Sequence, residues 1–327
     1  GMVVLGQQAG QYTAGGNSVL LGSLAGRYVS GSNNVMLGFN AGVGDTLQQS
    51  TATMTNVQKN VGIGSYALNK LGASMQSTVA IGHQAGQYVT GSYNTFVGGD
   101  AGKGPNSAPY ASGVNNTALG YQALYSFTSG NHNNAIGYFA GQAITSGASN
   151  NLMGYYAGND ITTGNYNVAL GHSSLQSISN VDGNTAVGHQ AFMSRTTGDG
   201  VAIGRGAGIT GGGADAIYIG LNAGALAGSS SGYCIGIGNW ALRFNDDGEY
   251  NVAIGRVSQM GISGKSHSNN TSVGYESLKY IVGDDSVGIG SEAGTYASGS
   301  YNTFVGSDAG KGGTTSAPYS SGESNTA

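Results

Sequence analysis

Five aromatic rings and one guanidinium occupy the same position in six consecutive repeats of this sequence. In a structure of stacked repeats, such side chains would lie about 4.8 Å apart and form a ladder. The ladder could stack against a sugar, or the imidazoles of His172 and His189 could hold a metal ion between them. Two imidazoles alone are weak support for a metal site, so we expect a structural ladder without metal or cofactor. The six residues are Tyr121, Tyr138, Tyr155, His172, His189 and Arg205.

Catalysis is not expected from this sequence. Three of the five histidines, His83, His172 and His189, occupy the repeat position just described, so their recurrence reflects the repeat. No Ser-His-Asp arrangement can be argued from the spacing, and the carboxylates are scattered through expected turns. The sequence therefore predicts a protein that is not an enzyme.

Three segments that interrupt the regular repeat are better candidates for binding. Insertions in repeat folds project from one face, which is often the binding face. A bracing loop that packs on a neighbouring chain is an equally good interpretation. The segments are residues 43–59, 103–115 and 311–324. The candidate contacts for a receptor or glycan are Tyr110, Tyr319, Tyr121, Tyr138 and Tyr155.

A short repeat built around one glycine, called the anchor glycine below, must position all these residues. It recurs 18 times, mostly every 16 or 17 residues. The residue before it is aliphatic or Met in all 18 repeats, and the third residue after it is Ala in 15. Asn lies four residues before it in 11 repeats. We expect structural anchors at Gly82, Gly120, Gly171, Gly204, Gly255 and Gly290, supported by Ile203, Ile254 and Asn251.

A longer repeat lies over the short one. Residues 93–104 recur almost unchanged as residues 301–312, an offset of 208 residues or 12 repeats. The chain begins and ends in the middle of a repeat. We therefore expect residues 1–327 to be one continuous section of a longer fibre.

The repeat length indicates the fold. Sixteen or seventeen residues fit two short strands and two turns, which make one coil of a β-solenoid, and coils must stack to bury their apolar residues. Helices are not expected, because no stretch with helical periodicity survives this density of glycine. The sequence predicts an all-β, parallel β-solenoid of about 18 coils.

The two faces of each strand predict self-association. Val252 and Ile254 should share one strand face, and Ala253 and Gly255 the other, because side chains alternate. A strand that is apolar on both faces needs burial on both. We expect Ile254 to fill the inside of the coil and the small residues to allow close approach of a second chain. The result would be a homo-oligomer about a long axis.

Composition excludes several classes of protein. The 327 residues include 62 Gly and one Cys, and only 8% are charged, with a net charge of −4. The net charge, without any basic run, argues against nucleic-acid binding. No run of 18 apolar residues occurs, so no membrane insertion is expected. A single Cys excludes a disulfide scaffold.

Particular repeats resemble those of known fibrous proteins. Residues 78–85, 184–191 and 251–258 (TVAIGHQA, NTAVGHQA and NVAIGRVS) resemble the head repeats of trimeric autotransporter adhesins. Residues 116–124, NTALGYQAL, are similar to repeats in tail-fibre proteins of phages and phage-like particles. The resemblance implies a left-handed β-roll with three chains in one rod.

The same resemblance implies a function. It favours a phage or phage-like tail fibre that attaches a virion to its host through a cell-surface glycan or protein receptor. The alternatives are the head of a bacterial trimeric autotransporter-type adhesin and an extracellular structural filament without a receptor. All three place the chain outside the cell, on a virion or on a cell surface.

Overall fold

The computed structural model describes residues 1–44, 56–210, 213–228, 230–313 and 322–327. The chain divides into two compact units, Gly1–Asn167 and Val168–Ala327. The described residues form 18 strands, nine in each unit, and turns between them. Within these ranges no helix occurs that is long and apolar enough to cross a membrane.

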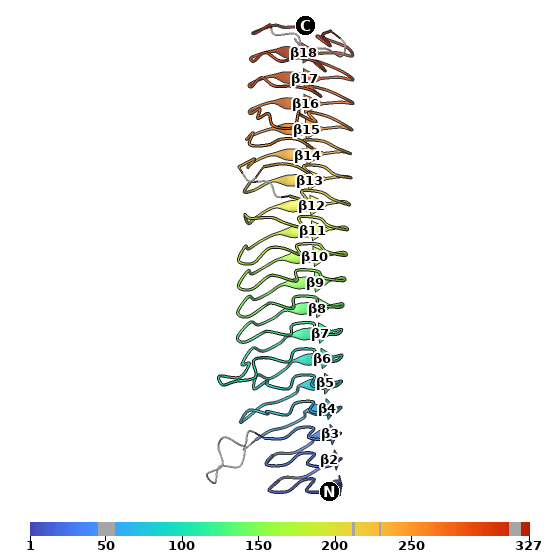
Figure 1. Cartoon of the computed structure of the whole chain (residues 1–327), viewed down its shortest axis with the longest axis vertical. Helices are drawn as coiled ribbons and strands as arrows, with labels where there is room; N and C mark the ends of the chain where they lie inside the picture. Colours follow the sequence, from blue (N-terminus) through green and yellow to red (C-terminus); the bar gives the residue numbers. More distant parts are fainter. Residues whose placement is uncertain (45–55, 211–212, 229, 314–321) are drawn as a thin grey trace. The chain divides into compact units, whose positions relative to one another are not determined.

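The first unit is a stack of coils, each with one strand. Every strand pairs in parallel with the next one along the chain, and Ala118 lies opposite Ala135 in this register. Successive strands therefore lie one above another (Figure 1). The strands are β1 (Met2–Leu5), β2 (Ser18–Leu21), β3 (Val35–Leu37), β4 (Val61–Ile63), β5 (Val79–Ile81), β6 (Thr95–Val97), β7 (Thr117–Leu119), β8 (Asn134–Ile136) and β9 (Asn151–Met153).

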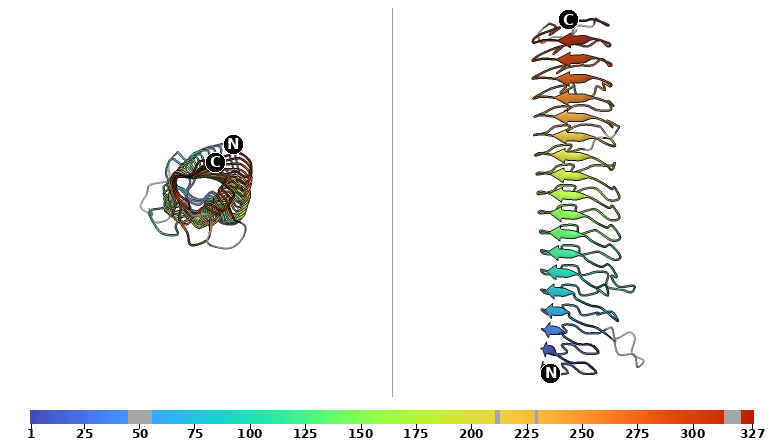
Figure 2. Two further views of the ribbon diagram at one scale, coloured as in Figure 1. Left: turned by 90° about the horizontal axis from the view of Figure 1, so that it is seen from above. Right: turned by 180° about the vertical axis from the view of Figure 1, so that it is seen from behind.

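The second unit repeats this arrangement. Its strands also pair in parallel in sequence order, and within the unit their arrows point the same way (Figure 2). The predicted parallel β-solenoid is thus confirmed. The strands are β10 (Val168–Leu170), β11 (Thr185–Val187), β12 (Val201–Ile203), β13 (Ile217–Ile219), β14 (Ile235–Ile237), β15 (Val252–Ile254), β16 (Thr271–Val273), β17 (Val287–Ile289) and β18 (Thr303–Val305).

The expectation of two strands in each coil was wrong. Residues with left-handed backbone angles follow the one strand, and they prevent a second strand from forming. After β7 in the sequence, Gln122 has a φ of 53° and Leu124 has a φ of 50°. Residues at these two positions have positive φ in coil after coil. Extended backbone needs negative φ, so this part of the coil is a series of turns.

The anchor glycine follows each strand and has a left-handed φ, which is 135° at Gly255. A Cβ there would lie 2.3 Å from the carbonyl oxygen of Gly274, the anchor of the next coil. Both the backbone angle and the close approach require glycine. The φ values of the six named anchors lie between 132° and 140°.

The two strand faces are the reverse of those expected. Ala253 is fully buried inside its coil, whereas Ile254 is 39% exposed. Ile203 points outward in the same way and is 40% exposed. The expected burial of Ile254 within the coil was therefore wrong, and so was the assignment of the small residues to an interface between chains.

The reason is that two positions share the inside of each coil. The middle residue of the strand and the fourth residue after the anchor glycine both point inward. In one coil these two residues are Leu152 and Gly158. A Cβ added to Gly158 would lie 2.7 Å from the leucine side chain. In another coil the sizes are reversed: the strand residue is the small Ala118, and the second inward residue is the buried Leu124. The interior accepts one large side chain from either position, so the strand position is small wherever the other one is large.

Buried asparagines join neighbouring coils at the position four residues before the anchor. The backbone N–H of Asn133 donates to Oδ1 of Asn116 at 2.9 Å, and its side-chain amide donates to the carbonyl of Gly147 at 2.8 Å. Asn150 donates to Oδ1 of Asn133 in the same way. Asn251 is fully buried and continues this pattern in the second unit, where its Oδ1 accepts from the N–H of Asn270 at 3.0 Å. Each amide thus satisfies backbone groups that would otherwise be buried without a partner.

Candidate functional site

The residues that follow the anchor glycines form ring ladders within each unit. In the first unit, the ring centroids of Tyr121 and Tyr138 are 5.5 Å apart, and those of Tyr138 and Tyr155 are 5.3 Å apart. In the second unit, His172 and His189 stack at 5.1 Å. The expected ladder is confirmed for these five rings.

The geometry of the tyrosine ladder favours a structural role over sugar stacking. Tyr138 lies between two stacked neighbours, and a ring whose faces are covered has little face left for a sugar. The hydroxyl of Tyr121 accepts a hydrogen bond from Gln122 at 3.1 Å. Amides of Gln122, Gln142 and Asn159 are linked from coil to coil beside the rings. The ladder is therefore a packed side-chain network on the surface of the coils.

A metal at the two stacked histidines lacks further ligands. Within the described ranges, no group of three or more His, Cys, Asp and Glu side chains is placed to hold a metal ion. The structure thus brings His172 and His189 together as stacked rings and adds no carboxylate or thiol to complete a site.

Backbone hydrogen bonds hold both ends of the loop between β6 and β7. The backbone N–H of Tyr88 donates to the carbonyl of Lys103, and the N–H of Ala111 donates to the carbonyl of Tyr88, both at 2.9 Å. The N–H of Gly104 donates to the carbonyl of Tyr125 at 3.0 Å. Both ends of the loop are thereby fixed to coils on either side, and the segment between them projects from the stack (Figure 1).

A hollow of about 400 Å³, called the loop hollow below, lies beneath this projecting segment. Tyr110 returns from the loop and stacks on Tyr88, with ring centroids 5.9 Å apart. The structure thus places one of the expected contact residues, Tyr110, beside the hollow. The lining residues are Tyr88, Lys103, Gly104, Pro105, Asn106, Tyr125 and Ser126.

Lys103 is the charged group of the loop hollow, and its partners lie on the coils. Its ammonium donates to Oε1 of Gln84 at 2.7 Å and lies 3.1 Å from Oδ1 of Asp100. The same ammonium lies 5.4 Å from the ring centroid of Tyr125, within cation–π range. Because Asp100 balances its charge, the hollow carries no net charge from this pair.

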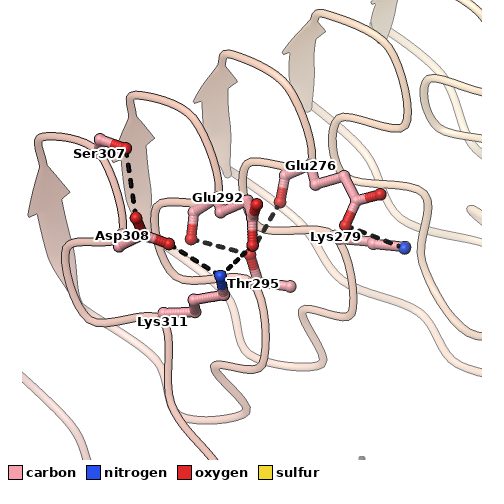
Figure 3. Close-up of polar contacts among 7 residues, drawn as sticks. All are labelled: Glu276, Lys279, Glu292, Thr295, Ser307, Asp308 and Lys311. Carbon is pink, nitrogen blue, oxygen red and sulfur yellow. Dashed lines mark hydrogen bonds and ion pairs between the residues drawn. The ribbon is translucent and has the colours of Figure 1, made fainter. Parts of the chain in front are cut away.

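The longer repeat places a related cluster in the second unit. Lys311 corresponds to Lys103, and its ammonium donates to Asp308 at 2.8 Å and pairs with Glu292 (Figure 3). These two carboxylates raise the pKa of the Lys311 ammonium above its ordinary value. Glu292 stands where the first copy has Gln84. The second cluster therefore has one more negative charge than the first.

Parts of the predicted insertions lie outside the described residues. These are residues 45–55 of the segment 43–59 and residues 314–321 of the segment 311–324, which include Tyr319. The insertion 103–115 lies entirely within the described residues.

Neither Lys103 nor Tyr125 was among the individual contact residues expected from the sequence. Lys103 is the first residue of the predicted insertion 103–115, but nothing local distinguishes it from the rest of that insertion. A signal was present in the longer repeat, because Asp100 and Lys103 recur together as Asp308 and Lys311. Tyr125 precedes no insertion, and only the folded stack brings it near Lys103.

An outward row of aliphatic side chains marks another surface in each unit. These residues directly precede the anchor glycines, and the nine named below are between 36% and 48% exposed. In the first unit the row includes Ile63, Ile81, Leu119 and Met153. In the second unit it includes Leu170, Ile203, Ile254, Val273 and Ile289.

Comparison of the chain with protein-family models and with curated protein sequences found no match.

Proposed function

We propose that this chain is a section of an extracellular attachment fibre, most simply the tail fibre of a phage or phage-like particle. The observation that carries the proposal is the combination of a β-solenoid with an outward aliphatic row and a projecting loop. The row provides a surface for self-association, and the loop provides a surface for attachment. Neither role requires a catalytic reaction, a cofactor, a nucleic acid or a membrane-spanning segment.

Self-association would occur through the aliphatic row. A monomer that keeps Ile203 and Ile254 in water exposes a contiguous apolar stripe, which is unusual for a soluble monomer. Further copies of the chain would cover it, because the outward aliphatic residues recur in each coil along a unit. The number three and a left-handed β-roll come from the resemblance to trimeric fibre heads.

Light scattering on the purified chain tests this assembly. We expect a homotrimer for the natural sequence and a loss of assembly for Ile254→Asp, since a carboxylate in an apolar interface has no partner. Leu226→Asp is the matched control, because Leu226 is also 39% exposed but lies outside the row. A monomeric natural chain, or equal effects of the two substitutions, would contradict the proposal.

Attachment is tested by binding of the fluorescently labelled chain to a panel of intact bacterial cells. We expect binding to some strains and its loss after periodate oxidation of surface glycans. The head of a trimeric adhesin would assemble in the same way, but its binding would favour host tissue surfaces. A structural filament would assemble and bind neither surface.

A further inference from the structure

We infer that the loop hollow binds one neutral pyranose of a surface glycan, with Tyr88 and Tyr125 against the sugar and Lys103 at its hydroxyls. The inference rests on the proposed attachment function and names the ligand class. The hollow is lined in part by Gly104, Pro105 and Asn106 of the insertion, which ordinary coils lack.

The size of the hollow suits a single sugar or the end of an oligosaccharide. Its volume of about 400 Å³ lies near the lower end of the roughly 300–1,000 Å³ found for small-molecule sites. A ligand of this size can reach the lining residues from solvent because the loop projects. A longer glycan chain would continue outward from the coils.

A pyranose presents an apolar and a polar surface, and the lining of the hollow has residues that complement each of them. Its C–H faces are apolar and match tyrosine rings, which have an apolar body and a polar hydroxyl. The hydroxyl rim matches polar groups such as an amide, a hydroxyl and an ammonium, which the lining residues Asn106, Ser126 and Lys103 carry. An apolar side chain of a protein partner would leave these polar groups unpaired, at a cost in binding free energy.

Lys103 can supply a donor without attracting an anion. An ammonium has three N–H donors, of which two are directed toward Gln84 and Asp100. The third can donate to a sugar hydroxyl in the hollow. Because Asp100 balances the positive charge, a carboxylate-bearing sugar gains no net attraction, and a neutral hexose is favoured.

The base of the hollow needs no large rearrangement to bind. Lys103, Gly104 and Ala111 are held by backbone hydrogen bonds to Tyr88 and Tyr125, and Tyr110 stacks on Tyr88. The two tyrosine walls are therefore fixed before the ligand arrives, which reduces the entropy lost on binding.

Saturation-transfer NMR with the full chain tests the inference. The probes are the methyl glycosides of glucose, galactose and mannose, with methyl glucuronide as the charged counterpart. We expect binding of at least one neutral glycoside and weaker binding of the glucuronide. Tyr125→Leu should weaken the neutral glycoside about tenfold, since a ring contact and a hydroxyl are lost, and Tyr125→Phe should restore most of the affinity.

The matched control for ring removal is Tyr12→Leu. Tyr12 stands at the same repeat position as Tyr88 and stacks on Tyr28 at 5.0 Å, but it is not a lining residue of the hollow. We expect this substitution to leave glycoside binding unchanged. Equal losses for Tyr12→Leu and Tyr125→Leu would overturn the inference, as would no binding of any neutral glycoside by a correctly folded chain.

Asp100→Asn tests the role of charge. Asn40 and Asn222 occupy the equivalent position in other coils with φ values of 54° and 52°, close to the 56° of Asp100, so the substitution should fold. It leaves the Lys103 charge unbalanced, and we expect the ratio of glucuronide to hexoside affinity to rise several-fold, about as expected for one added ionic contact. An unchanged ratio would overturn the placement of Lys103 beside the sugar.

The outcomes separate this inference from the proposed function. If Tyr125→Leu does not affect cell binding, the inference that the loop hollow is the glycan site is wrong, but the proposed attachment function still holds. Periodate-resistant cell binding that Tyr125→Leu abolishes would mean that the hollow receives a protein segment, and this also overturns the inference. Absence of any cell binding contradicts the proposed function itself.

Discussion

The guanidinium of Arg195 fills the space beside Gly200 that a side chain at position 200 would need. A Cβ on Gly200 would lie 2.5 Å from Nη2 of Arg195. Position 200 lies four residues before the anchor Gly204, where many coils have a buried asparagine. Nη2 of Arg195 donates to the carbonyl of Gly213 at 3.1 Å. Asn270 donates to the equivalent carbonyl, Gly283, in its own coil, so Arg195 substitutes for the missing asparagine.

This relationship predicts that positions 195 and 200 are coupled. Gly200→Asn alone should destabilise the chain by about 2 kcal/mol, because its side chain overlaps the guanidinium. Arg195→Ile alone should also cost about 2 kcal/mol, since the Gly213 carbonyl loses its donor. The double variant should recover most of this loss, because Ile is the residue at the position of Arg195 in several coils, such as Ile161 and Ile178.

Urea unfolding of the two single variants and the double variant measures the coupling. An interaction energy of about 1–3 kcal/mol is expected for residues that share one space and one acceptor. If the two single losses in the free energy of unfolding are strictly additive, Arg195 does not replace the buried asparagine that other coils have four residues before the anchor.

Anchor glycines should tolerate no side chain. Gly137→Ala places a Cβ 2.4 Å from the carbonyl oxygen of Gly154 and imposes a φ of 136° on alanine. We expect a loss of more than about 3 kcal/mol in the free energy of unfolding, from the backbone clash and the strained conformation together. The measurement is the urea midpoint of the purified variant.

Gly62→Ala is the control for this prediction. Gly62 occupies the middle of β4, where other strands have alanine, and its added Cβ would approach the flexible Met36 side chain at 3.0 Å. We expect a change within about 1 kcal/mol. A comparable loss at Gly62 and Gly137 would mean that loss of glycine flexibility, rather than contact between coils, limits the fold.

The repeat in the sequence was sufficient to predict the parallel solenoid, because the anchor glycine recurs in every coil and an asparagine lies four residues before it in 11 of the 18 repeats. It was insufficient to decide which strand face points inward. Alternation at Val252, Ala253 and Ile254 permits either answer, and larger aliphatic residues are usually the buried ones. Only the second inward position, for example Leu124 opposite Ala118, shows why the small residue is inside. That reciprocal pattern is present in the sequence but becomes meaningful once the turn geometry is known.

The candidate site was predictable only in part. The interruption of the repeat marked residues 103–115 as a projecting segment, and Tyr110 of this segment stacks on Tyr88, a lining residue of the loop hollow. The rest of the hollow comes from other coils, since Tyr88 belongs to the turn after β5 and Tyr125 to the turn after β7. Their approach depends on where the loop leaves and re-enters the stack, which a sequence period does not specify.

Buried His267 should make stability depend on pH. Burial lowers its pKa from the ordinary 6.5 to about 4, against the opposing effect of Asp284 and Asp246. Below about pH 6.5 the unfolded chain binds a proton that the folded chain does not, so stability falls as the pH falls toward 4. The expected loss from this residue is about 2 kcal/mol at about pH 5 relative to about pH 7.5.

Urea unfolding at these two pH values, on the natural chain and on His267→Leu, isolates this contribution. The variant should lose about 2 kcal/mol less than the natural chain when the pH is lowered. His83→Gln is the matched control, because His83 is exposed, and it should leave the pH dependence unchanged. Identical pH dependence in the natural chain and His267→Leu would show that His267 is not buried as a neutral ring.

The tyrosine ladder should be extendable by one coil at Gly99. This residue directly follows the anchor Gly98, one coil before Tyr121, and an added Cβ would lie 3.4 Å from Cδ2 and 3.7 Å from Cε2 of the Tyr121 ring, which is ordinary contact. Gly99→Tyr should therefore stack on Tyr121 and raise the free energy of unfolding by about 1 kcal/mol. Replacing a glycine also restricts the unfolded chain, so Gly99→Ala is needed to measure that effect separately. If the ladder stiffens the coils, the tyrosine variant must unfold at a higher urea concentration than the alanine variant. Equal midpoints would mean that the stacked rings accompany the fold without stabilising it.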